Sequence, residues 1–149
     1  MKPKDRIRIR REELGLKMSD VARSARIGID AYRDTEWHED EAFTTANLGT
    51  MRAICKFLRL DLFSLFDIDG DLSSEVGAER HASKPIRNIV ISTKRIALGL
   101  TREELGDLVG FETIAIDQIE ENPDFLEQWS IQLIENLASQ LQLSISVLL

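Results

Sequence analysis

The chain has 149 residues, of which 43% are hydrophobic and 30% are charged, and its formal net charge is −7 at pH 7. No apolar stretch approaches the roughly 18 residues that a membrane span needs, and the N-terminus lacks the apolar centre of a secretory signal. A single cysteine, Cys55, excludes an internal disulfide, and two histidines are too few for a metal site. We therefore expect a cytoplasmic protein that has no membrane association, no cofactor and no bound metal.

Aromatic residues make up only 6% of the chain, and few runs alternate apolar and polar residues with the period of a strand. The fold class that this composition predicts is all-α. No Ser-His-Asp, Cys-His, phosphate-cradling or metal-ligand constellation appears in the sequence, so we do not expect an enzyme.

Apolar spacing in the first half of the chain predicts five helices followed by a polar linker at residues 70–85. The first helix is strongly basic, because residues 1–11 hold six Lys and Arg against Asp5 alone, a local net charge of +5. Ser19 is expected to cap the second helix, and Arg26 replaces the glycine that often ends such a helix. The expected helices cover about residues 4–13, 19–25, 29–35, 47–58 and 61–66.

The second half opens with an expected helix at about residues 86–98 and then carries a clear helix start. Thr101, with Glu104 three residues later, forms the pattern of a capping box, in which each side chain accepts a hydrogen bond from the other residue's backbone N–H. Gly110 is expected to end this helix with a positive φ. The apolar positions are Leu105, Leu108 and Val109 in this helix and Ile114, Ile116 and Ile119 in the next.

The two halves resemble each other when the chain is shifted against itself by 84 residues, which places Arg11 on Arg95. The C-terminal parts correspond at an offset of 83 and predict helices at about residues 130–141 and 144–149, the second capped by Ser144. We infer two tandem copies of a five-helix unit.

The second copy carries a series of short motifs at fixed spacing. They are Gly99-Leu100-Thr101, Glu103-Glu104-Leu105, Gly106, Gly110-Phe111, Ile116 and Ile119-Glu120. At these residues the sequence resembles the Cro/phage-repressor type of helix-turn-helix, also called the XRE family. The resemblance implies two tandem five-helix lambda-repressor-like helix-turn-helix domains, at residues 1–69 and 86–149, in a transcriptional regulator that binds double-stranded DNA.

The resemblance also implies which residues would meet DNA. In this family the start of helix 2 touches phosphate and base edges, and helix 3 enters the major groove with its N-terminal residues. The implied contact positions are Met18, Gly28, Ile29, Asp30 and Arg33 in the first unit, and Arg102, Glu112, Thr113, Ile114 and Asp117 in the second. The cations expected to bind phosphate are Arg6, Arg8, Arg10, Arg11, Lys17, Arg26 and Arg33.

Charge separates the two units. Residues 1–69 hold 13 Lys and Arg and 13 Asp and Glu, whereas residues 70–149 hold 6 and 13 and supply the whole net charge of −7. Helix 3 of both units departs from the pattern of a DNA reader, because acidic and apolar residues stand where Gln, Asn and Arg usually read bases. One hypothesis is therefore a regulator whose first unit binds DNA, while its acidic second unit dimerises or receives an effector.

A second hypothesis is a protein-binding antitoxin or immunity module, whose acidic surface neutralises a basic partner. Two connections, residues 37–46 and 122–129, are longer than those of the family and hold large aromatic side chains of the kind enriched in interfaces. Alternatively, these aromatic side chains fold back as lids on their own cores. The residues expected to bind a partner or a second copy of the chain are Trp37, Phe43, Glu112, Asp117, Phe125 and Trp129.

Overall fold

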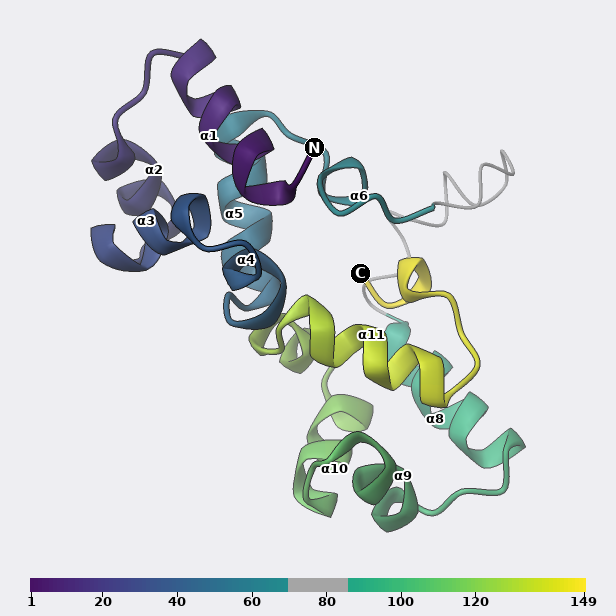
Figure 1. The fold of residues 1–149 in the computed structure, drawn as a ribbon. Helices are drawn as coiled ribbons and strands as arrows, with labels where there is room; N and C mark the ends of the chain where they lie inside the picture. The colour runs from purple at the N-terminus through teal and green to yellow at the C-terminus, as the bar shows by residue number, and fades with distance from the viewer. Residues whose placement is uncertain (70–85) are drawn as a thin grey trace. The chain divides into compact units, whose positions relative to one another are not determined.

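The structure is a computed structural model, and it describes residues 1–69 and 86–149 (Figure 1). The chain divides into two compact units, Met1–Asp69 (unit 1) and Gly70–Leu149 (unit 2). The expected linker, residues 70–85, lies outside the described residues. Every regular element within the described ranges is a helix and no strand occurs there, which confirms the all-α class.

The helices of both units begin and end close to the predicted residues, with η marking a 3-10 helix. Sequence patterns did not predict α4 and η1, which form inside the two long connections that were expected to be loops. Unit 1 contains α1 (Pro3–Glu13), α2 (Met18–Ala25), α3 (Ile29–Trp37), α4 (Glu41–Thr44), α5 (Leu48–Leu58) and α6 (Leu62–Leu65). Unit 2 contains α8 (Arg87–Ala97), α9 (Arg102–Val109), α10 (Thr113–Glu121), η1 (Pro123–Gln128), α11 (Ile131–Gln140) and η2 (Ile145–Val147).

Both units use the same order and packing of helices. The starts of α1, α2 and α3 precede those of α8, α9 and α10 by 84 residues (3 to 87, 18 to 102, 29 to 113), and α5 precedes α11 by 83 (48 to 131). In unit 1, α2 packs against α3 and α5, and α1 packs against α3. In unit 2, α9 packs against α10 and α11, and α8 packs against α10. Residues at these offsets therefore occupy equivalent places in the two units.

Side chains near the helix starts satisfy some of the backbone donors that every helix leaves unpaired. The predicted capping box is confirmed, because Glu104 N donates to Thr101 Oγ1 at 3.1 Å and Thr101 N donates to Glu104 Oε2 at 2.8 Å. Ser19 is not a cap, since α2 begins one residue earlier and Asp20 accepts a hydrogen bond from the Lys17 N–H at 3.1 Å. Ser144 occupies the N-cap position of η2 as predicted, but its side chain makes no capping hydrogen bond, and its hydroxyl lies 2.8 Å from that of Ser146.

Left-handed residues end equivalent helices in the two units. Gly110 ends α9 with φ of 80°, as predicted, and Arg26 ends α2 with φ of 57°. An arginine in this conformation costs on the order of 1 kcal/mol relative to glycine, which has no Cβ to clash with the backbone. Because both units turn in the same way, the third helix follows the second at an equivalent point in each unit.

Aliphatic side chains fill the core of each unit, and in unit 2 Leu105, Val109, Ile116 and Ile119 are buried as predicted. Two other positions that were assigned to apolar faces are exposed. They are Leu108, with 49% of its surface accessible, and Ile114, with 58%. α9 packs against α10 and α11, α10 packs against α8 and α9, and both Leu108 and Ile114 lie outside the buried stripes of these helices. The equivalent residues of unit 1, Ser24 and Asp30, are also exposed.

The two leucines of α9 provide a matched test of this core. We expect Leu105→Ala to lower the free energy of unfolding of unit 2 by about 2–5 kcal/mol, because it removes buried methyl groups and leaves a cavity. Leu108→Ala removes the same atoms from an exposed site and should change stability by less than about 0.5 kcal/mol. Denaturant unfolding followed by circular dichroism measures both values, and equal losses would contradict the observed helix phase.

Candidate binding faces around the second and third helices

A buried arginine–glutamate pair fixes the third helix of each unit. In unit 1, Arg11 Nε donates to Glu36 Oε1 at 2.6 Å, and Arg11 Nη2 donates to Oε2 at 2.9 Å. The same guanidinium donates from Nη1 to the Leu16 carbonyl at 3.1 Å, just before α2 begins. One side chain of α1 therefore holds both the entry to α2 and the end of α3.

Unit 2 repeats this arrangement with Arg95 and Glu120 at the equivalent positions. Arg95 Nε and Nη2 donate to the two oxygens of Glu120, and Nη1 donates to the Leu100 carbonyl at 2.8 Å. The Glu120 side chain is almost fully buried, as is that of Glu36. Such a pair is stable only when further hydrogen bonds compensate for the lost water.

The compensating donor differs between the units. In unit 1 the hydroxyl of Tyr32 donates to Glu36 Oε1 at 2.5 Å. In unit 2 an isoleucine, Ile116, occupies that place, and Arg102 Nε donates to Glu120 Oε2 at 2.6 Å instead. Each carboxylate therefore accepts from three donor groups, and the third donor comes from α3 in unit 1 and from α9 in unit 2.

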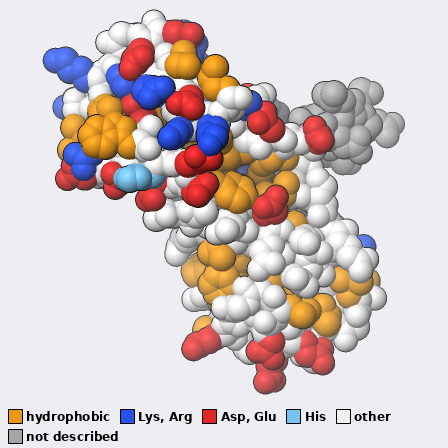
Figure 2. Space-filling model, in the orientation of Figure 1, with side chains coloured by type: hydrophobic (Ala, Val, Ile, Leu, Met, Phe, Trp, Pro, Cys, Tyr) orange, Lys and Arg blue, Asp and Glu red, His pale blue; other side chains and the backbone are white. Residues whose placement is uncertain are grey.

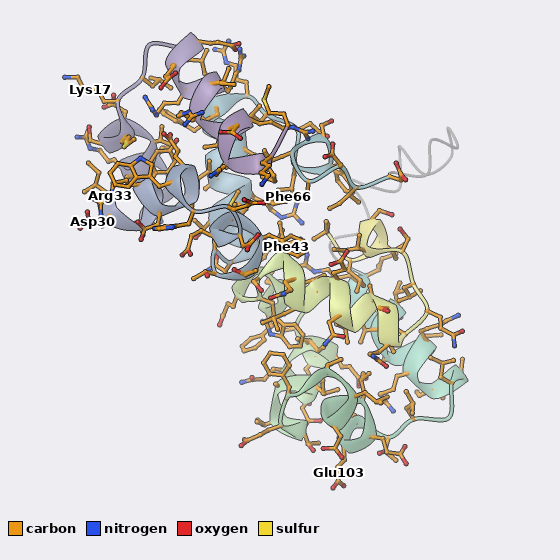
Figure 3. All side chains as sticks on the ribbon, in the orientation of Figure 1. Lys17, Asp30, Arg33, Phe43, Phe66 and Glu103 are labelled. Atoms are coloured by element: carbon orange, nitrogen blue, oxygen red, sulfur yellow. The ribbon has the colours of Figure 1, made fainter. Side chains whose placement is uncertain are left out.

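The candidate binding face of unit 1 consists of the exposed N-terminal part of α3 and the two ends of α2. Gly28, Ile29 and Asp30 are exposed, as the resemblance implied, and Met18 is half-buried. Arg33 Nη1 lies 2.8 Å from Asp30 Oδ1, and its guanidinium lies 4.9 Å from the centre of the Trp37 ring. Lys17, Asp30 and Arg33 extend outward from the same side of the unit (Figure 3). This face is mixed in charge rather than uniformly basic.

The basic first helix does not form the free cationic surface that the sequence predicted. Arg6 donates to the Leu65 carbonyl at 3.1 Å and pairs with Asp67 at 2.8 Å. Arg10 Nε donates to the Leu58 carbonyl at 3.0 Å. Together with Arg11, these side chains fasten α1 to the rest of unit 1. Arg8 is exposed and pairs with Asp5 on the same helix at 2.9 Å.

The corresponding face of unit 2 is strongly acidic. Residues 99–122 hold one Arg against seven Asp and Glu, whereas the equivalent residues 15–38 of unit 1 hold four Lys and Arg against four Asp and Glu. Arg102, expected to contact DNA, instead pairs with Asp117 at 2.8 Å and with Glu120. Thr113 and Glu112 are exposed at the start of α10. Red side chains accordingly gather at the end of unit 2 formed by α9 and α10, where Glu103 projects outward (Figures 2 and 3).

The four aromatic residues of the long connections do not share one environment. Trp37 is 58% exposed, whereas Trp129 is 5% exposed and stacks on Phe111, with ring centres 4.4 Å apart and planes inclined by 19°. Trp129 is therefore a lid on its own core and does not offer its ring to a partner. Phe43 contacts Phe66 with ring centres 6.1 Å apart, and Phe125 is half-buried.

Sequence reasoning missed one buried arginine that organises unit 2. Arg87, 1% exposed, donates from Nε to the Pro123 carbonyl at 2.6 Å and from Nη1 to the Leu148 carbonyl at 3.2 Å. It also contacts Glu127 at 3.2 Å. Pro3 stands at the equivalent position of unit 1, so the internal repeat gave no signal for this residue.

Comparison with known proteins finds no family model, no curated protein and no solved structure that matches the chain. None of the helices in the described ranges is both long enough and apolar enough to cross a membrane. The described residues also contain no group of three or more His, Cys, Asp or Glu side chains that could hold a metal ion.

The single tyrosine of the chain allows the buried pair of unit 1 to be followed directly. Burial, and then the hydrogen bond to Glu36, raises the pKa of Tyr32 well above its usual value of 10.0. The unfolded chain loses the phenol proton near pH 10 while the folded chain keeps it. The stabilisation is therefore complete below about pH 10 and is lost as pH rises above it. We expect phenolate absorbance to appear only as unit 1 unfolds; phenolate formation near pH 10 in a fully helical protein would contradict this.

Tyr32→Phe isolates the hydrogen bond to Glu36. We expect it to lower the free energy of unfolding of unit 1 by about 1.5–3 kcal/mol at neutral pH, the usual contribution of a hydrogen bond to a charged group. It should also remove the part of the pH dependence above pH 10 that belongs to this phenol. Denaturant unfolding at pH 7 and pH 10.5 measures both effects, where roughly pH 10.5 lies just above the unfolded pKa.

Proposed function

We propose that the chain is a tandem helix-turn-helix protein of the Cro/phage-repressor type, in which unit 1 binds double-stranded DNA and unit 2 does not. Support comes from the succession of α2, a left-handed turn and α3, which leaves the N-terminal residues of α3 exposed as an element that enters the major groove requires. Unit 2 repeats this succession with α9 and α10.

A charge contrast between equivalent positions carries the assignment to unit 1. The backbone frame is shared, yet each cation of unit 1 on α2, on α3 and in the turns before them is neutral or acidic in unit 2. The pairs are Lys17 and Thr101, Arg23 and Asp107, Arg26 and Gly110, and Arg33 and Asp117. Phosphate neutralisation supplies most of the affinity for duplex DNA, so the face of unit 2 repels DNA whereas that of unit 1 can attract it.

The number of phosphate contacts should be small. Arg33 is held by Asp30, whereas Lys17, Arg23 and Arg26 are exposed and make no ion pair within the described ranges. About three contacts give a slope of log affinity against log salt of roughly −3, far shallower than the seven cations expected from the sequence would give. Asp30 is suited to accept a hydrogen bond from a cytosine amino group in the major groove.

Grafting residues from unit 2 onto unit 1 tests this proposal without straining the fold. Lys17→Thr with Arg26→Gly introduces the residues that unit 2 carries at equivalent places, so the frame accepts both. We expect the double variant to bind DNA more weakly and to flatten the salt slope by roughly two units, one for each lost contact. Fluorescence anisotropy with a labelled duplex from upstream of the gene, between about 50 and 200 mM salt, measures the slope.

A matched control is available on α5. Lys56→Thr with Arg59→Gly makes the same two substitutions at exposed positions, and Arg59 also has a positive φ, of 54°. This variant loses the same charge from another helix and should keep the parent slope. If both variants flatten the salt slope equally, the change would be due to net charge alone and not to contacts at Lys17 and Arg26. A parent chain without salt-sensitive binding at about 50 mM salt would overturn the proposal.

The acidic face of unit 2 favours a second candidate function, that of a protein-binding module for a basic partner. Leu108 and Ile114 are exposed there among Glu103, Asp107 and Glu112, a combination of apolar and acidic groups that suits a basic amphipathic surface. This is the antitoxin or immunity hypothesis confined to one unit. It becomes the preferred function if the full chain shows no DNA binding in the anisotropy experiment.

A further inference from the structure

Unit 2 contains an aromatic stack that unit 1 lacks. The ring of Trp129 stacks on that of Phe111. Phe111 lies in the turn before α10, and Trp129 directly precedes Ser130, the cap of α11. The equivalent positions in unit 1 are Ile27 and Ala46, because Ser130 and Asn47 cap the equivalent helices α11 and α5. The indole of unit 2 is thus replaced by a methyl group in unit 1.

The space that the indole fills in unit 2 remains open in unit 1. A cavity of about 190 Å³ lies beside Ile27 and Ala46, walled by α3 on one side and by the start of α5 on the other. A cavity of about 150 Å³ is enough to bind benzene in another protein. The remaining lining residues are Ala31, Thr35, Glu41, Thr45, Asn47 and Thr50.

Glu41 gives the cavity a charge preference. It is half-buried at the edge, and its carboxylate makes no ion pair with any described residue. A cationic group on a ligand would therefore find an opposite charge at the opening, while the ring would contact Ile27 and Ala31. The Trp129 indole at the equivalent place in unit 2 indicates the shape of a ligand that fits, and Glu41 indicates its charge.

We propose that this cavity of unit 1 binds a small aromatic amine, a flat system of one or two rings that carries a protonated amino group. The ring takes the place of the Trp129 indole, and the amino group faces Glu41. The cavity borders α3, so a bound ligand would contact the same helix that the proposed DNA contact uses. The binding itself does not depend on DNA, and its test involves none.

Tryptamine is the probe, because its ring is the indole of tryptophan and its side chain ends in an ammonium group. Titration of the isotopically labelled full chain should shift the backbone amide signals of Ile27, Ala31 and Thr50 with a Kd in the high micromolar to millimolar range, typical of a fragment-sized ligand, about −4 to −5 kcal/mol. Indole supplies the ring without the charge, and hexylamine supplies the charge without the ring. We expect indole to bind more weakly and hexylamine to shift none of these signals.

Two variants separate the contributions. Ala46→Trp fills the cavity with the side chain that unit 2 uses and should abolish tryptamine shifts at these amides. Glu41→Gln keeps the cavity and removes the charge, so tryptamine should lose roughly two- to fivefold in affinity, the effect of an exposed ion pair, while indole is unchanged. If Ala46→Trp does not fold, Ala46→Phe fills less of the same space and serves the same purpose.

The outcomes are distinct. The proposal is overturned if about 5 mM tryptamine shifts none of the three amides, or if a cavity-filling variant that folds binds as well as the parent chain. It is also overturned if hexylamine shifts the same signals as tryptamine. Success here together with failure of the DNA experiment would leave the cavity assigned and the proposed function rejected.

Discussion

The buried arginine–glutamate pair is the interaction on which the rest of each unit depends. Arg11 and Arg95 bring the last turn of the first helix, the chain that enters the second and the end of the third to one guanidinium. Removing either partner would leave a buried charge without compensation, which typically costs about 3–5 kcal/mol. The position of the exposed start of α3 or α10 is therefore set by contacts on the buried side of the helix.

A frame fixed in this way leaves the outer surface free to vary. The core positions of the two units carry similar aliphatic residues, while the net charge of the second and third helices with their turns changes from zero in unit 1 to −6 in unit 2, one cation against seven carboxylates. Function resides in such surfaces and not in the fold that carries them. The first helix shows why charge totals mislead, since Arg6, Arg10 and Arg11 contribute to its net +5 and yet hold the fold together.

Sequence reasoning predicted best those features that neighbouring residues determine. Thr101 and Glu104 cap a helix wherever a helix starts, and Gly110 ends one because it accepts a positive φ. The self-similarity at 84 residues gave the helix order. Sequence reasoning failed where contacts between distant segments determine the structure. Leu108 is exposed because α10 and α11 pack against another side of α9. α4 and η1 form in segments that have no apolar periodicity. The partners of Arg6, Arg10 and Arg87 lie about 36 to 61 residues away, beyond any local pattern.

Because the two units share one frame, each acts as an internal control for the other. A feature present in both, such as Arg11 with Glu36 and Arg95 with Glu120, is explained by the needs of the fold. Arg26 and Gly110 differ at an equivalent position, so an arginine is not needed there for the turn to form. Arg26 even costs stability that glycine would spare. Under the proposed function, this exposed arginine offers DNA a phosphate contact that Gly110 cannot provide.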